Sequence, residues 1–332
     1  MKQKRLTFLL LLISNLFCAS AQKWYKPEID LKVEELLSQM TVEEKLGYIG
    51  GIDWMYTKSI DRLGIHRMRM SDGPQGIGTK GKSTAYPATV TLAATWNENL
   101  AYQYGKALGR DCRARNINVI LGPAVNIYRA PMCGRNFEYM GEDPYLTSRI
   151  CVGYIKGVQD QGVMATVKHF VANNSDYDRN NISNDIDERT LNEIYFPAYK
   201  AAIQEAEVGA IMTSYNLMNG IYTTENPWLL KEVLRNQWGF KGLVMSDWGS
   251  THYCVPAARS GLDLEMAGGE KMNPKDMAYY LKTGDVTMDM VDEKVRHILR
   301  ILIAFGFKDG TEADKSLSLI HISEPTRPIS IS

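Results

Sequence analysis

Polar and aromatic residues follow several short apolar segments of this chain, at the points where buried strands would leave the core. Three of these ends carry acid, cation or aromatic side chains: Asp72, the pair Lys168 and His169, and the pair Asp247 and Trp248. Carboxylates and cations form strong hydrogen bonds to neighbouring hydroxyl groups, and an indole ring stacks on the apolar face of a sugar. The set therefore suits a polyhydroxylated, uncharged ligand.

Other chemistries have less support in the sequence. No set of His, Asp and Glu residues has a convincing metal-binding spacing, and we expect no metal and no cofactor. No G-x-G-x-x-G follows the first apolar segment, and there is no P-loop. A Schiff-base lyase that uses Lys168 is an alternative, but it leaves Asp247 without a role.

Short apolar segments alternate with longer helical patterns along the chain. We expect strands at 67–71, 92–95, 118–121, 163–167, 210–213, 243–245 and 262–265, and helices near 98–115, 146–161, 188–207, 225–238, 275–282 and 287–305. Thr41 and Glu44 fit a capping box, and Asn97, Asp187 and Thr224 are candidate N-caps. Such alternation predicts a parallel sheet. We favour an α/β fold of the (β/α)8 TIM-barrel type, regular or irregular and incomplete, in which the active site lies at the carboxyl ends of the strands.

Composition narrows the class of partner. The 332 residues carry no formal net charge, which argues against nucleic acid and anionic membranes, because both require a basic face. Apart from Cys18, the cysteines are scattered at 112, 133, 151 and 254, so neither a metal site nor a disulfide framework is predicted.

Both ends of the chain differ from its middle. Lys2, Lys4 and Arg5 precede an apolar run at 6–17, and Ala19-Ser20-Ala21 follows. This pattern predicts a signal peptide over 1–21, cleaved after Ala21, and a secreted or periplasmic protein without a membrane segment in its mature form; a membrane anchor is the alternative. The stretch 316–332 has no periodicity and no caps, and we expect a non-native or disordered tail there. The folded domain is then 22–315.

Five ordered motifs resemble one enzyme family. They are MSDGP (70–74), GRNFEYMGEDPYL (134–146), KHFVANN (168–174), MTSYN (212–216) and LVMSDWG (243–249). Their residues, order and spacing are similar to the signatures of glycoside hydrolase family 3. The resemblance covers about residues 25–315, which is essentially the N-terminal barrel of that family.

The resemblance implies a role for each motif residue. Asp247 matches the nucleophile of a retaining hydrolase, which forms a covalent glycosyl-enzyme that water then releases. Trp248 matches the aromatic wall beside the anomeric carbon, and Asp72 the residue that binds the hydroxyls farthest from the scissile bond. The other implied sugar-contacting residues are Arg135, Lys168, His169, Arg179, Met212 and Tyr215. Glu138 and Glu142 are interpreted as structural acids that bond Arg135 and nearby backbone amides.

A retaining hydrolase also needs a general acid/base. In most of the family this is a Glu from a second α/β domain, so we expect the chain to be truncated before that domain, which becomes its missing partner. The N-acetylglucosaminidase branch carries a Pro-Gly-His in the loop that here reads KHFVANNSDYDR, so that branch is rejected. Asp72 in SDGP favours a β-glucosidase acting on the non-reducing ends of β-linked glucosides or oligosaccharides. A β-xylosidase and a non-catalytic glycan-binding or vestigial barrel stay open as alternatives.

Overall fold

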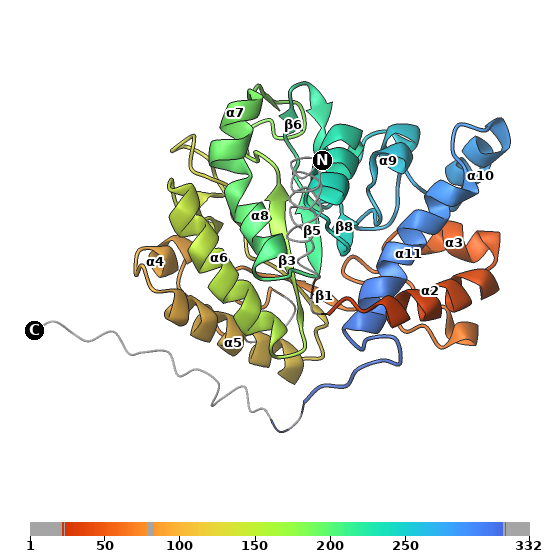
Figure 1. Ribbon diagram of the computed structural model, residues 1–332, viewed down its shortest axis with the longest axis horizontal. Helices are drawn as coiled ribbons and strands as arrows, with labels where there is room; N and C mark the ends of the chain where they lie inside the picture. The colour runs from red at the N-terminus through yellow and green to blue at the C-terminus, as the bar shows by residue number, and fades with distance from the viewer. Residues whose placement is uncertain (1–21, 23, 79–82, 315, 317–332) are drawn as a thin grey trace, which may run out of the picture.

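The computed structural model describes residues 22, 24–78, 83–314 and 316. Its centre is one parallel sheet with the strand order β1-β2-β3-β5-β8 (Figure 1). The strands are β1 (Met70–Asp72), β2 (Val119–Leu121), β3 (Met164–Phe170), β5 (Ala210–Thr213) and β8 (Leu243–Met245). All of their residues except Asp72 are buried, as expected for a parallel sheet covered on both faces.

Single bridges continue the ring of strands beyond this sheet. Leu264 pairs with Met245 on β8, and Glu265 pairs with Gly50, both in parallel. Antiparallel bridges from Tyr56 to Ile52 and to Arg69 then lead back to the residue before β1. The α/β barrel class predicted from the sequence is confirmed in its irregular form, because five strands alone do not close the barrel.

Two of the expected strands are not strands in the structure. Residues 92 and 93 belong to helix α4 (Thr89–Ala93), and 262–265 forms only bridges. Leu92 and Ala93 are buried, so a short apolar run that packs against the core as a helical turn was mistaken for a strand. Such runs are ambiguous from periodicity alone.

Helices surround the sheet, with α2, α3 and α11 on one side and α4, α5 and α6 on the other (Figure 1). The helices not yet given are α2 (Pro27–Gln39), α3 (Val42–Tyr48), η1 (Asp61–Leu63), α5 (Glu98–Ala114), η2 (Asn136–Glu138), α6 (Pro144–Gln159), α7 (Glu188–Thr190), η3 (Leu191–Tyr195), α8 (Pro197–Gln204), η4 (Thr223–Glu225), η5 (Trp228–Gln237), α9 (Cys254–Ser260), α10 (Pro274–Thr283) and α11 (Met288–Ala304).

Side-chain caps account for several helix starts. The Thr41 side chain accepts from Glu44 N–H in the predicted capping box, and the Asn97 and Asp187 side chains accept from the third residue after each. Thr224 is not an N-cap. It lies inside the short turn η4, and the Asn226 side chain accepts from Leu229 N–H instead.

A small second sheet lies beside the carboxyl ends of the main strands. It consists of β4 (Ser183–Asn184), β6 (Leu217–Met218) and β7 (Ile221–Tyr222). β6 and β7 form a hairpin through Asn219 and Gly220, both at positive φ, as a two-residue turn of this kind requires. The hairpin connects β5 to η4, and this connection is used below.

The predicted ends of the chain lie mainly outside the described residues. Nothing described covers the leader predicted at 1–21, and of the tail predicted at 316–332 only Ser316 is described, so both stay predictions. Within the described part, no helix is both long enough and apolar enough to span a bilayer.

A buried ion cluster joins β8 to the helices η5 and α11. The carboxylate of Asp263 accepts from Val244 N–H at 2.8 Å, from Arg235 Nη2 at 2.7 Å and lies 2.7 Å from His297 Nδ1. Burial raises the pKa of Asp263, but His297 and Arg235 outweigh burial and hold it below its ordinary value. The carboxylate is therefore charged and fully paired.

We predict that Asp263→Ala lowers the free energy of unfolding by about 3–5 kcal/mol, because it leaves Arg235 buried without its partner. Urea unfolding followed by circular dichroism measures the change. The control is Asp285→Ala, whose partner Arg259 lies 3.6 Å away in a half-exposed pair, and which should change stability by less than about 1 kcal/mol. Equal effects of the two substitutions would contradict the assignment.

Candidate active site

The carboxyl end of β8 places Asp247 at the centre of a charged network. β8 ends at Met245, and Asp247 is only 6% exposed. The N–H of Trp248 donates to Asp247 Oδ1 at 2.7 Å. This bond fixes the orientation of the carboxylate, so that Oδ2 faces the side chains of the neighbouring strand ends.

Arg135 bridges the acids and the histidine of the network. Its Nε donates to Glu138 Oε1 at 2.5 Å, its Nη1 lies 3.4 Å from Asp247 Oδ2, and its Nη2 lies 2.7 Å from His169 Nε2. Glu138 Oε2 is also 3.5 Å from Lys168 Nζ. One guanidinium therefore links residues from the loop after β2, from β3 and from the loop after β8.

His169 is neutral in this setting. Burial, followed by the charges of Arg135, Lys168 and Arg179, holds its pKa well below the ordinary value. Nε2 then accepts from Arg135, and Nδ1 carries the proton and lies 3.3 Å from Asn126 Oδ1. The 3.4 Å approach of Nε2 to Asp247 Oδ2 is consequently not an ion pair.

Burial disfavours the ionised form of Asp247. Burial raises its pKa above the ordinary value, although Arg135, Lys168 and the N–H of Trp248 act in the other direction. A carboxylate that is buried yet hydrogen-bonded at one oxygen keeps the other available to react. This combination is typical of functional carboxyl groups.

A cavity of about 530 Å³ opens beside the network. Its walls include Asp72, Arg135, Glu138, Lys168 and Arg179, with residues 73–77, 83–85, Gly134, Phe137 and Asp176 completing the lining. The volume lies within the range of small-molecule sites, about 300–1,000 Å³. Asp72 ends β1 and is exposed to this space, so the cavity presents carboxylates and cations together.

Aromatic residues connect the loop after β8 to its neighbours. Tyr215 Oη donates to the backbone oxygen of Trp248 at 2.8 Å, and the guanidinium of Arg179 lies 3.9 Å from the centroid of the Tyr215 ring. Burial, followed by the charge of Asp247, raises the pKa of Tyr215, so its hydroxyl stays protonated. The indole Nε1 of Trp248 donates to the backbone oxygen of Trp54 at 2.8 Å.

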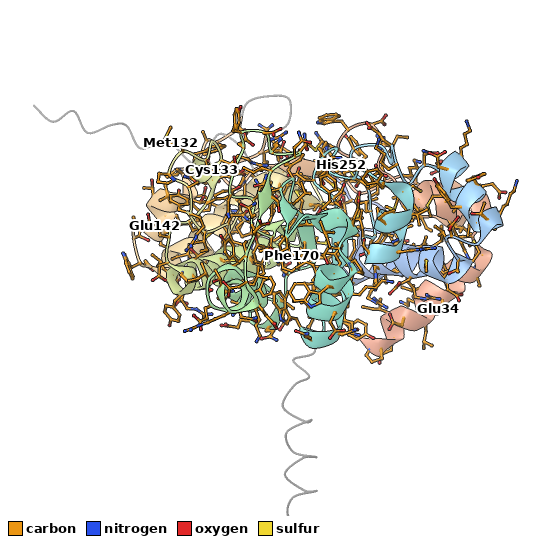
Figure 2. The ribbon with its side chains drawn as sticks, turned by 90° about the horizontal axis from the view of Figure 1, so that it is seen from above. Glu34, Met132, Cys133, Glu142, Phe170 and His252 are labelled. Atoms are coloured by element: carbon orange, nitrogen blue, oxygen red, sulfur yellow. The ribbon has the colours of Figure 1, made fainter. Side chains whose placement is uncertain are left out.

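Most of the predicted residues meet here, but two do not join the network. Met212 is buried on β5, where its backbone pairs with that of Met245. It does not line the cavity, and neither do His169, Tyr215, Asp247 and Trp248. Glu142 is exposed and lies away from the central Phe170 (Figure 2); it makes no ion pair with Arg135 in the described part of the chain. The interpretation of Glu142 as a partner of Arg135 is wrong: it lies beyond the loop turn that carries Glu138.

Sequence reasoning missed Asn126. Its Oδ1 accepts from His169 N–H at 2.8 Å and its Nδ2 donates to the His169 oxygen at 2.9 Å, so it fixes the backbone beside the network. Asn126 stands shortly after β2, and the same strand-end pattern that marked Asp72 could have found it. In the described residues no group of three or more His, Cys, Asp or Glu could hold a metal ion.

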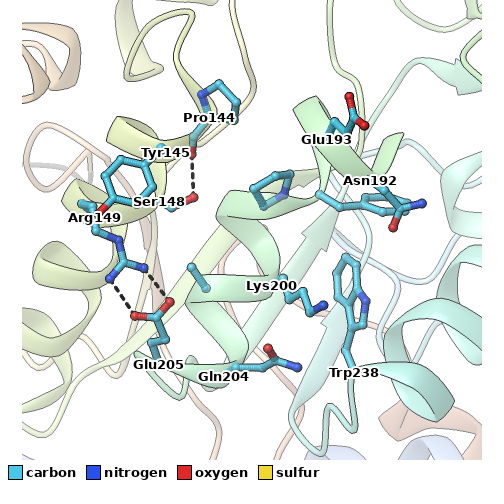
Figure 3. A pocket seen from close by; sticks show the side chains of 13 residues that line it. Pro144, Tyr145, Ser148, Arg149, Asn192, Glu193, Lys200, Gln204, Glu205 and Trp238 are labelled. Atoms are coloured by element: carbon cyan, nitrogen blue, oxygen red, sulfur yellow. Dashed lines mark hydrogen bonds and ion pairs between the residues drawn. The ribbon is translucent and has the colours of Figure 1, made fainter. Parts of the chain in front are cut away.

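A second hollow lies outside the barrel, between α6, α8 and Trp238 (Figure 3). Its volume is about 450 Å³. Arg149 and Glu205 form a bidentate pair on its wall, with separations of 2.7 and 2.5 Å. None of the network residues line it, whereas Arg135, Glu138 and Lys168 line the first cavity.

Comparison with known proteins places the chain in one family. Residues 41–301 match the model of the glycosyl hydrolase family 3 N-terminal domain. A β-glucosidase of Rhizobium radiobacter is 44% identical over 280 residues, which are 82% of this chain and 34% of that protein. Thermostable β-glucosidase B of Acetivibrio thermocellus is 41% identical over 297 residues, 85% of this chain and 39% of that protein.

Solved structures agree with these sequences. β-Glucosidase 3B from Thermotoga neapolitana, in complex with α-D-glucose, aligns with a TM-score of 0.80 and 36% identity over 86% of this chain and 45% of that one. The chain thus spans less than half the length of each of these proteins. Because both the family model and the structural neighbours match, the resemblance inferred from the five motifs is confirmed, and the chain belongs to glycosyl hydrolase family 3, whose N-terminal domain it carries.

Proposed function

We propose that this chain is the nucleophile-bearing barrel of a retaining, exo-acting β-glucosidase. The observation that carries the proposal is the carboxylate of Asp247, which is buried at a strand end, held at Oδ1 by Trp248 N–H and set 3.4 Å from Arg135 Nη1. Relatives named β-glucosidases, and structural neighbours solved with glucose, support a glucoside as the substrate.

The proposed reaction proceeds in two displacements. Asp247 Oδ2 attacks the anomeric carbon, forming an ester bond as the bond to the leaving oxygen breaks, and that oxygen takes a proton from a general acid. Water, deprotonated by the same group, then attacks the anomeric carbon and releases the sugar and the free carboxylate. Two inversions give retention of configuration.

The general acid/base is proposed to lie outside the described residues. Glu138 is the other carboxylate in the network, but both of its oxygens face cations, Arg135 and Lys168. Both oxygens of Glu138 are therefore already engaged, and neither is directed at a leaving group. A second domain is the proposed source of the acid, because the matched relatives are more than twice as long as the aligned region.

The sugar hydroxyls are proposed to bind in the cavity beside the network. Asp72 and Glu138 offer acceptors, while Lys168, Arg135 and Arg179 offer donors. The groups are charged but of both signs, which suits an uncharged sugar. A non-catalytic glycan-binding barrel remains the second candidate, because the same cavity would hold a sugar without turnover.

The nucleophile is tested by trapping. A 2-deoxy-2-fluoro-β-glucoside with a dinitrophenolate leaving group needs little acid assistance, so we expect it to add one fluoroglucosyl group to the wild-type chain. Mass spectrometry should place the adduct on the peptide that contains Asp247. Asp247→Asn should lose the adduct, whereas Asp289→Asn, an exposed aspartate on α11, should keep it. A folded wild-type chain that binds glucose but never forms the adduct would favour the non-catalytic candidate.

The pH profile is expected to follow Asp247. Attack requires the ionised carboxylate, and burial raises its pKa, so activity is lost as the pH falls through a value above the ordinary 3.8. Glu138 contributes to the rise. Glu138→Gln should therefore move the acidic limb of kcat/KM for dinitrophenyl β-glucoside to lower pH. If the acidic limb does not move in Glu138→Gln, the limb does not report the ionisation of Asp247.

Asp72 is expected to act on binding rather than on folding. It is exposed at the end of β1, and loss of its charged hydrogen bonds to hydroxyls should cost about 1.5–3 kcal/mol, or about 10- to 150-fold in kcat/KM. Asp72→Ala should show this loss on dinitrophenyl β-glucoside while its urea midpoint stays close to wild type. An unchanged kcat/KM would remove Asp72 from the proposed site.

A further inference from the structure

A short turn behind the site contacts the loops that follow two different strands. This turn consists of Tyr222, which ends β7, and the three residues of η4, and we call it the 222–225 turn. It follows the β6–β7 hairpin and precedes η5. Thr223, Thr224 and Glu225 are all buried. Buried polar side chains in succession require partners, and each of these three has one on a different residue of the site loops.

The turn contacts the nucleophile loop at 250–253. Thr224 Oγ1 donates to the Ser250 oxygen at 3.1 Å. Glu225 Oε1 accepts from the N–H groups of His252 and Tyr253, each at 2.8 Å. The ring of Tyr222 stacks on that of His252, with centroids 3.7 Å apart and planes 16° apart; Figure 2 shows His252 near one edge of the molecule.

Ser250 links this loop to Asp247. Both the N–H and Oγ of Ser250 donate to the Asp247 backbone oxygen, at 3.2 and 3.0 Å. Gly249, at φ 76°, donates to the Met266 oxygen at 3.1 Å. The chain therefore makes a tight turn between Asp247 and Ser250, and the position of Ser250 sets that of the Asp247 backbone.

The same turn holds the loop after β5. Thr223 Oγ1 donates to the Ser214 oxygen at 3.0 Å and accepts from Ser214 N–H at 3.0 Å. The next residue, Tyr215, donates to the Trp248 oxygen. The 222–225 turn thus bonds both Ser214 and Ser250, and the loops that carry these residues are bonded to each other through Tyr215 and Trp248.

We propose that Glu225, assisted by Thr224, is a positioning residue for the nucleophile: it holds the loop at 250–253 so that the Asp247 carboxylate stays aimed at the anomeric carbon. Glu225 touches neither Asp247 nor the cavity, so it acts through the backbone. The inference rests on the proposed function of Asp247. A displacement of about 1 Å at a reacting group costs on the order of 100-fold in rate, which is the scale of the expected effect.

The test compares three variants with the wild-type chain. Glu225→Ala removes the acceptor. Glu225→Gln keeps one acceptor oxygen, replaces the other with an NH2 group and removes the charge. Thr224→Val removes the donor with little change of shape. Glu232→Ala is the matched control, because Glu232 is exposed on the next helix and, among the residues that the structure describes, bonds only the side chains of Asn236 and Gln237. The readouts are the rate of adduct formation with the 2-fluoro reagent at saturation, and the dissociation constant of glucose by calorimetry.

We expect Glu225→Ala to slow adduct formation by about 10- to 100-fold, with the glucose dissociation constant within about threefold of wild type. Glu225→Gln and the control should stay within about threefold in both readouts, and Thr224→Val should slow the adduct in the same direction by a smaller factor. If Glu225→Ala does not fold, Thr224→Val carries the test.

Three results overturn the inference. Wild-type rates in both Glu225→Ala and Thr224→Val would remove the positioning role alone. Parallel loss of adduct rate and glucose binding, without rescue by Glu225→Gln, would make Glu225 a structural residue only. A wild-type chain that forms no adduct on Asp247 would overturn the proposed nucleophile, and the positioning role with it.

Discussion

The contact between Arg135 and Asp247 is the interaction on which the site depends. Burial of a carboxylate is costly unless opposite charge and hydrogen bonds compensate it. Here the compensation is incomplete. Arg135 Nη1 lies 3.4 Å from Asp247 Oδ2, whereas Arg135 Nε donates to Glu138 Oε1 at 2.5 Å. Arg135 is thus held mainly by Glu138, and Asp247 retains a raised pKa.

The parallel sheet makes this contact possible. Arg135 comes from the loop after β2, His169 from β3 and Asp247 from the loop after β8, and Arg135 and Asp247 are 112 residues apart in the chain. Because parallel strands all end at the same edge, residues from distant parts of the chain converge there. Behind the site, Asn126 and Glu225 bond the backbone at 169 and at 252–253, so they limit how far the chain can shift there.

The sequence predicts this arrangement well where side-chain chemistry coincides with strand ends. Asp72, Lys168 and Asp247 follow apolar runs, and each lies where such a pattern places it. The five ordered motifs also identify the family.

Sequence reasoning fails where a helix and a strand would show the same apolar pattern, as in the helical turn at 89–93. It also fails where a residue acts through backbone contacts. Glu225 stands in a polar stretch and resembles a helix start, and only the fold brings it against 252–253.

Glu142 illustrates the opposite limit. It lies four residues after Glu138 in one motif, and both acids looked equally able to pair with Arg135. The 3-10 turn η2 ends at Glu138, and the chain then leaves the site toward α6, so only the first acid faces inward. Sequence spacing cannot tell which of the two acids pairs with Arg135, because the pairing depends on where the turn η2 ends.

The electrostatics of the site fit the chemistry proposed for it. The network holds two acids, Asp247 and Glu138, against two cations, Arg135 and Lys168, while His169 stays neutral. An uncharged sugar therefore enters without creating an unpaired charge. In the ester proposed for Asp247, this side chain would lose the negative charge that burial disfavours. The desolvation that raises its pKa therefore also favours the proposed attack.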